Sequence, residues 1–141
     1  MITSIRRRRT FAELRDRGHR VSHGAVRLTY LDNAAADHPL DSTPQVAYAL
    51  GRRFGTAVER NRARRRLRDA FARSWVDHLH QLDQLDHTKT TSPTPRLDGA
   101  FLLSGHRGLL TAPFAQLVND VSTCLARLAA ASADRVSESP R

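Results

Sequence analysis

Apolar residues recur at helical spacing in two long stretches of the chain. In the first stretch, residues 57–75, one stripe is formed by the apolar residues Ala63, Leu67, Ala70 and Phe71 and is continued by the small polar residue Ser74. The second stretch starts after Pro113, a residue suited to the first turn of a helix, and its stripe runs from Phe114 to Leu128. Because residues three and four apart share a helix face, the spacing predicts two amphipathic helices, each with one side buried.

Three shorter segments have the alternating or continuously apolar character of strands. Residues 20–32 alternate, most clearly from Val26 to Tyr30, and residues 45–50 alternate again. Residues 100–104 form a short apolar run, which predicts a buried strand. Because strands and helices are interleaved along the chain, the order predicts an α+β or α/β sandwich rather than a helical bundle.

A short helix is predicted near the N-terminus, over residues 10–17. Thr10 and Glu13 have the spacing of a capping box, and Gly18 is a natural stop. The irregular segments are predicted to be a basic arm over residues 1–9, a surface loop over 33–44, a mobile loop over 86–97 and a disordered tail over 132–141. We therefore expect a single folded domain over residues 1–131.

Positive charge is concentrated in two parts of the chain. Its 23 lysine and arginine residues face 14 acidic residues, which gives a net charge of +9. Residues 1–30 hold eight arginines against two acidic residues, and residues 52–73 hold nine against two. Such clusters indicate a polyanionic partner, with nucleic acid the first candidate and an anionic membrane surface the second. No apolar run approaches the roughly 20 residues that span a bilayer, so we expect a cytoplasmic protein.

The densest charge lies within the first long helix, where residues 60–68 contain six arginines. Several of them, such as Arg62 and Arg66, are four residues apart, and each like-charged pair costs about 0.2–0.5 kcal/mol in an isolated helix. A purely structural helix would dilute these charges with glutamate, whereas only two acidic residues flank the run. We therefore interpret the run as a surface that binds a polyanion.

The candidate chemistry is that of binding, since the sequence shows no catalytic or metal site of the protein's own. The histidines lack an accompanying cysteine cluster, so zinc is not expected. The lone Cys124 lies among apolar helix positions and is predicted to be a buried thiol. Residues 51–55 lack the lysine and the spacing of a phosphate-binding loop. Phe11 and Tyr30 are candidates for stacking on unpaired bases, as aromatic side chains do when proteins bind single-stranded RNA.

The run from Gly51 to Phe71 resembles the signature of the bacterial ribonuclease P protein subunit. It contains a basic glycine turn, an aliphatic lead-in, Arg-Asn-Arg at residues 60–62, a basic pair, and then Leu-Arg and an aromatic residue. Weaker flanking matches occur in the expected order: Phe11 before Gly18, a strand ending at Leu31 and Asp32, and a strand after Asp98. The resemblance covers nearly the whole chain.

The resemblance implies a more specific fold than the spacing does. It implies an α+β, single-domain, two-layer sandwich in which about four strands form a mixed sheet that packs with three helices. It also implies a left-handed βαβ crossover through the arginine-rich helix, as in folds of the ribosomal protein S5 domain 2-like type. Such a crossover would be a rare exception to the right-handed rule.

The resemblance also implies where RNA would bind. The arginine-rich helix and the turn before it should contact the catalytic RNA through Arg52, Arg53, Arg60, Asn61, Arg62, Arg64, Arg65, Arg66 and Arg68. A cleft for the single-stranded 5′ leader of precursor tRNA should be lined by Phe11, Arg15, Thr29 and Tyr30. Two positions depart from the family pattern: Arg15 stands where a second aromatic residue is common, and Thr29 stands where a tyrosine is expected.

The activity that the resemblance implies belongs to a ribonucleoprotein of one protein and one RNA. The RNA removes the 5′ leader from precursor tRNA with Mg²⁺ that is bound mainly by the RNA, and the protein supplies no catalytic residue and no metal ligand. Two alternatives remain open. A ribosomal or other structural RNA-binding protein would explain the charge but not the ordered motif, and a DNA-binding module would need a helix-turn-helix or zinc finger that the sequence does not show.

Overall fold

The computed structural model describes residues 3–5, 8–32, 44–87, 97 and 99–138. Its centre is one mixed sheet of five strands in the order β1-β4-β5-β3-β2. The strands are β1 (Thr3–Ser4), β2 (His19–His23), β3 (Val26–Asp32), β4 (Gln45–Tyr48) and β5 (Gly99–Gly105). The helices are α1 (Arg8–Arg17), α2 (Ala57–His87), α3 (Gly108–Thr111) and α4 (Phe114–Glu138), and the short 3₁₀ helix η2 spans Arg52–Phe54.

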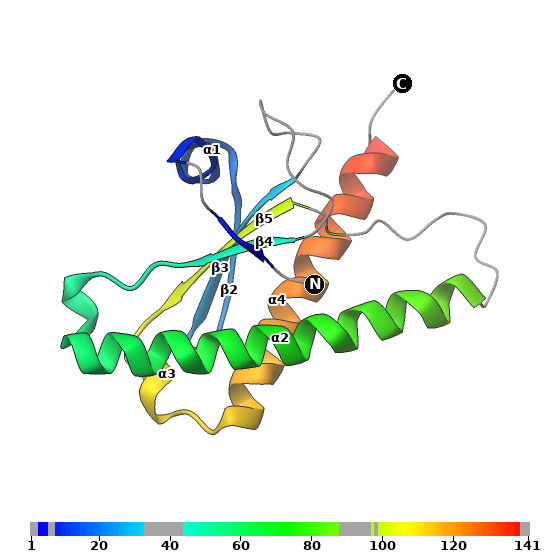
Figure 1. Cartoon of the computed structure of the whole chain (residues 1–141). Coiled ribbons are helices and arrows are strands. Elements are labelled where there is room, and N and C mark those ends of the chain that lie inside the picture. Colours follow the sequence, from blue (N-terminus) through cyan, green and yellow to red (C-terminus); the bar gives the residue numbers. More distant parts are fainter. Residues whose placement is uncertain (1–2, 6–7, 33–43, 88–96, 98, 139–141) are drawn as a thin grey trace.

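The two long helices, α2 and α4, pack together on one face of the sheet (Figure 1). The predicted α+β sandwich is confirmed, with four strands of four to seven residues and three main helices. The two-residue strand β1, which pairs in parallel with β4, was not predicted. Strands β4 and β5 are parallel neighbours joined through α2, which is the predicted βαβ connection. The left-handedness of this connection stays a prediction.

An aromatic cluster holds α2 against the sheet. Phe101 of β5 lies 4.9 Å from Tyr30 of β3, 5.3 Å from Phe71 and 5.6 Å from Trp75, measured between ring centroids. Phe71 is fully buried, as are Leu67 one turn earlier and Ala63 two turns earlier on α2. The predicted apolar stripe of this helix is therefore confirmed as its core-facing side, and the cluster fixes which side of the helix faces outward.

The segment from residue 20 to residue 32, predicted as one alternating strand, is an antiparallel hairpin of β2 and β3. Its turn contains Gly24, whose φ of +58° favours glycine. Behind this turn Asp120 of α4 is 1 % exposed and accepts a hydrogen bond from the Gln116 amide at 2.9 Å, with His23 Nδ1 also at 2.9 Å. A Cβ at position 24 would lie 2.4 Å from an Asp120 carboxylate oxygen, so the tip of the hairpin is packed closely against α4.

The ends of the helices differ from the predicted ones. Helix α1 begins at Arg8, which places Thr10 inside the helix as a buried residue, so the predicted N-cap at Thr10 is wrong. Helix α2 continues to His87, and α4 continues to Glu138, well into the segment predicted as a tail from Ser132. Most of the predicted mobile loop and the last three residues of the predicted tail lie outside the described residues.

Candidate nucleic-acid interface

A capping box starts the arginine-rich helix. The Thr56 amide donates to Glu59 Oε1 at 2.9 Å, and the Glu59 amide donates to Thr56 Oγ1 at 3.1 Å. These two reciprocal bonds satisfy amides that a helix N-terminus otherwise leaves unpaired. The sequence has the Thr-x-x-Glu pattern at both Thr10 and Thr56, but a capping box was predicted only at Thr10. The box fixes where the helix begins, four residues before the first arginine of the run.

The outer side of α2 is cationic over its first three turns. Asn61, Arg62, Arg65 and Arg68 are exposed, while Ala63 and Leu67 between them are fully buried. Arg60 and Arg64 are partly exposed. The predicted separation of a polar side from a core side is therefore confirmed for this part of the helix. We call the exposed and partly exposed set Arg60, Asn61, Arg62, Arg64, Arg65 and Arg68 the arginine face.

Two contacts show how the arginine face is oriented. Arg64 Nη1 donates to the Asn61 side-chain oxygen at 2.8 Å, so these two side chains are held together one turn apart. Arg68 lies near β4, since its positive charge acts on Tyr48 of that strand. Burial raises the pKa of Tyr48, and the positive charge of Arg68 partly offsets that increase. At Arg68 the arginine face therefore comes near β4.

Arg66 does not belong to this face, contrary to the sequence prediction. Its guanidinium is partly buried and donates from Nη1 to the Leu109 carbonyl at 2.7 Å and from Nη2 to the Ala112 carbonyl. Both carbonyls lie in or just after α3, in the segment that joins β5 to α4. The physical reason is geometric, because Arg66 projects from the side of α2 that faces α3 rather than from the outer side. Two of its five N–H donors are therefore used within the protein.

The turn before α2 places two further arginines at the surface. Arg52 and Arg53 are exposed within η2, and Phe54 beside them is 7 % exposed and anchors the turn in the core. Arg107 Nη1 donates to the Phe54 carbonyl at 2.8 Å, and Arg107 Nη2 lies 2.7 Å from Glu59 Oε2. The bonds from Arg107 and from Thr56 lower the pKa of Glu59 to about 2. The sequence offered no signal for this link, because its partners are 48 and 53 residues apart.

The described residues cover only part of the sheet face opposite α2 and α4. At one end α1 packs on it through Leu14, which joins Ile5, Leu31 and Ala100 in a second small core. Thr29 lies on this face and is 7 % exposed, because Gly18 at the end of α1 approaches its methyl group closely. Phe11 of α1 is 38 % exposed, and Arg15 one turn later is also exposed. The structure thus brings three of the four predicted cleft residues to one side of the sheet.

Tyr30 is the exception, and its predicted place in the cleft is wrong. The side chain is 2 % exposed and its ring packs on Phe101 in the main core, under α2. Successive residues of a strand point to opposite faces, so Thr29 and Tyr30 cannot both line one cleft. The same alternation places Arg27 with Thr29, and Arg20, which pairs with Thr29 across the hairpin, shares that face. Both arginines are exposed, and the sequence analysis missed them.

A cavity of about 350 Å³ lies between the far end of this sheet face and the turn at residues 51–55, which precedes α2. Its walls come from β3, the end of β5 and η2, and they include Arg27, Ser104, Arg53, His106 and Arg107. The cationic residues of the sheet face and those of the turn therefore meet around one depression. Neither His106 nor Arg107 was predicted to contribute, since they follow β5 at a distance in the sequence from both basic clusters.

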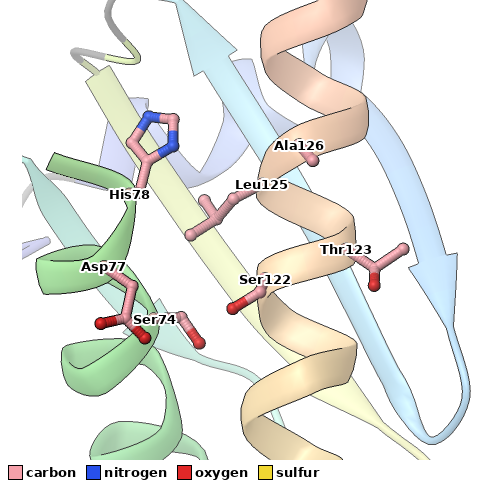
Figure 2. A pocket seen from close by; sticks show the side chains of 7 residues that line it. All are labelled: Ser74, Asp77, His78, Ser122, Thr123, Leu125 and Ala126. Carbon is pink, nitrogen blue, oxygen red and sulfur yellow. The ribbon is translucent and has the colours of Figure 1, made fainter. Parts of the chain in front are cut away.

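A second cavity, of about 200 Å³, lies between α2 and α4 and has no arginine or lysine in its lining (Figure 2). Ser74 points across it toward Ser122, and Ser74 Oγ donates to the Val118 carbonyl at 3.0 Å. His78 Nε2 is buried and has no hydrogen-bond partner among the described residues, and burial lowers the pKa of His78. This cavity lies in the helical layer, away from the basic surfaces.

The part of the chain that the structure describes contains neither a cluster of metal-binding side chains nor a membrane-spanning helix. In that part, no group of three or more histidine, cysteine, aspartate or glutamate side chains is placed to hold a metal ion. None of the described helices is both long enough and apolar enough to cross a membrane. Cys124 is fully buried, as predicted, and burial raises the pKa of its thiol to about 11.

Comparison with known proteins gives a consistent result. The family model described as Ribonuclease P matches residues 3–129. The chain is 41% identical over 68 residues to the ribonuclease P protein component of Acidothermus cellulolyticus, covering 48% of this chain and 53% of that protein. It is 40% identical over 90 residues to the component from Caulobacter vibrioides, covering 64% of this chain and 50% of that protein. The matched region therefore spans about half the length of these curated relatives.

Solved structures with the same fold include two ribonuclease P proteins. The protein from Thermotoga maritima superposes with a TM-score of 0.62 at 16% identity, covering 88% of this chain and 96% of that one. The protein from Staphylococcus aureus superposes with a TM-score of 0.58 at 17% identity, covering 89% and 94%. At these identities the likeness shows the fold, and the α+β architecture is common to all three chains.

Proposed function

Because the chain belongs to the ribonuclease P protein family, we propose that it is the protein subunit of a bacterial ribonuclease P, bound one to one to the catalytic RNA. The single observation that supports this role most is the arginine face, a dense cationic surface whose opposite side is anchored in the aromatic core. A rigid surface of this kind can contact several phosphates at once without first being ordered. The holoenzyme would remove the 5′ leader from precursor tRNA in the cytoplasm.

In this proposal the protein binds and orients RNA, and the RNA carries the chemistry. Mg²⁺ bound mainly by the RNA would activate water and stabilise the charge that develops at the scissile phosphate. The described part of the protein offers no cluster of side chains suited to hold such an ion. We assign to Arg62, Arg65 and their neighbours the role of neutralising phosphates of the catalytic RNA.

We assign the partly covered sheet face to the single-stranded 5′ leader. Phe11 offers an exposed ring on which a base can stack, and base–aromatic stacking is worth about 1–3 kcal/mol per base. Arg15, Arg20 and Arg27 offer guanidinium groups for leader phosphates on the same side. The cavity lined by Arg27 and Arg53 makes this surface continuous with the turn before α2, so leader and catalytic RNA would be held side by side.

Reconstitution tests the proposal directly. We expect that adding this protein to a bacterial ribonuclease P RNA at a low Mg²⁺ concentration restores cleavage of precursor tRNA, because the protein's cations replace part of the screening that the metal supplies. The protein without RNA is the control and should cut nothing. A lack of stimulation together with tight binding to ribosomal RNA would instead indicate a structural RNA-binding protein. Cleavage by the protein alone would contradict the assignment of the chemistry to the RNA.

A further inference from the structure

Two arginines connect the start of α2 to the segment between β5 and α4 in opposite directions. Arg66 extends from α2 and donates to the Leu109 and Ala112 carbonyls of that segment. Arg107 extends from the segment and donates to the Phe54 carbonyl, at 2.8 Å, and to Glu59 Oε2, at 2.7 Å. The two links join the same pair of elements at points about two turns apart along α2.

The first turns of α2 need such links more than most helices do. Arginines four residues apart repel each other along this stretch, and each pair costs a few tenths of a kcal/mol, about 0.2–0.5. The turn before the helix contains only three residues of 3₁₀ helix and two exposed arginines. Without tertiary links, this segment would have to be ordered when RNA binds, and that ordering would weaken the affinity.

We propose that Arg66 and Arg107 are positioning residues. They hold the turn at residues 51–55 and the start of α2 in their RNA-binding geometry in the free protein. The proposal rests on the function proposed above. Positioning differs from direct contact with RNA, because Arg66 and Arg107 donate hydrogen bonds to protein carbonyls and to Glu59. It also gives a role to Glu59, an acidic residue next to a surface that binds a polyanion.

The direction in which the substitution Glu59→Gln changes RNA affinity distinguishes positioning from direct contact. Removing a negative charge beside a phosphate-binding surface should tighten RNA binding through simple electrostatics. If Glu59 positions the surface through Arg107, Glu59→Gln should weaken binding instead, by about threefold for a partly exposed ion pair. Glutamine retains the capping-box geometry with Thr56, so the helix start is preserved.

The experiment measures the dissociation constant for a bacterial ribonuclease P RNA at fixed salt, in two backgrounds. In the wild-type background we expect Glu59→Gln to weaken binding, and in the Arg107→Ala background we expect the same substitution to tighten it. Asp69→Asn, which removes an exposed carboxylate from the same helix, is the matched control and should tighten binding in both. If Glu59→Gln tightens binding in both backgrounds as well, the positioning role is refuted.

A measurement on the free protein keeps this test independent of the proposed function. The Phe54 amide donates to the Gly51 carbonyl at 3.0 Å, and the Arg60 amide donates to the Thr56 carbonyl at 2.9 Å. We expect both amides to exchange hydrogen faster in Arg107→Ala than in wild type, because their turn has lost its link. Unchanged exchange would refute the link itself, whereas failure of the wild-type protein to bind the RNA would refute only the proposed function.

Discussion

Replacing Arg66 by alanine should destabilise the protein, although the residue lies within an arginine run that would otherwise be assigned wholly to RNA. The substitution removes both hydrogen bonds to the Leu109 and Ala112 carbonyls. Hydrogen bonds from charged groups contribute about 1.5–3 kcal/mol each, and partial access of water to Arg66 reduces that to about 1 kcal/mol each. The substitution also removes the repulsion between Arg66 and Arg62, which stabilises the folded protein by about 0.2–0.5 kcal/mol. The expected net loss in the free energy of unfolding is therefore about 1.5 kcal/mol.

Urea denaturation followed by tryptophan fluorescence is a suitable assay, because the one tryptophan, Trp75, lies in the aromatic cluster between α2 and the sheet. A loss of this size should lower the thermal midpoint by about 5 °C for a chain of this length. The matched control is Arg65→Ala, which removes the same charge from the adjacent exposed position and should change stability by less than about 0.5 kcal/mol. Equal stability of the Arg66→Ala and Arg65→Ala proteins would refute the assignment of Arg66 to the fold.

Three further predictions address RNA binding and pH. Arg62→Glu combined with Arg65→Glu should abolish RNA association while leaving the unfolding midpoint nearly unchanged, since both side chains are exposed; cleavage that persists at moderate salt would contradict the arginine face. Phe11→Ala should weaken binding of leader-bearing precursor more than of mature tRNA, and equal losses would point to a packing role for Phe11 instead. The difference in unfolding free energy between wild type and Glu59→Gln should be constant above about pH 5 and should shrink as the pH falls toward 2, because the folded-state pKa of Glu59 is lowered to about 2 from 4.5. A difference that stays constant down to pH 2 would show that Glu59 is not ion-paired in solution.

The pH dependence follows from the direction in which folding shifts the pKa of Glu59, which is downward. A carboxylate whose pKa is lower in the folded state is protonated more readily in the unfolded state, so its contribution is complete above the unfolded value. That contribution is lost as the pH falls through the folded value. Both Glu59 and Arg107 are partly exposed, with side-chain exposures of 32% and 60%, so solvent and salt will reduce the effect. Measurement at low ionic strength gives the larger signal.

The elements of the fold that depend on local pattern could be predicted from the sequence. The core side of α2 follows from the spacing of Ala63, Leu67 and Phe71, and the helix beginning after Pro113 follows from its own stripe. Burial of an amphipathic stripe is a property of each segment by itself, so no knowledge of the partner is needed. The hairpin turn at Gly24 was missed because the alternation of apolar residues does not show where a strand reverses.

The sequence by itself determined that the chain has a cationic helix with an apolar underside, and the ordered motif from Gly51 to Phe71 identified its family. Only the tertiary structure decided which arginines of this helix are exposed and which bond to the protein itself. Arg65 and Arg66 are neighbours of the same type, yet the first is exposed and the second donates to carbonyls more than 40 residues away. The alternation along β3 similarly assigns Thr29 and Tyr30 to opposite faces once the register with β5 is known. The reason is that a side chain's partners are set by the packing of distant elements, and local sequence does not specify that packing.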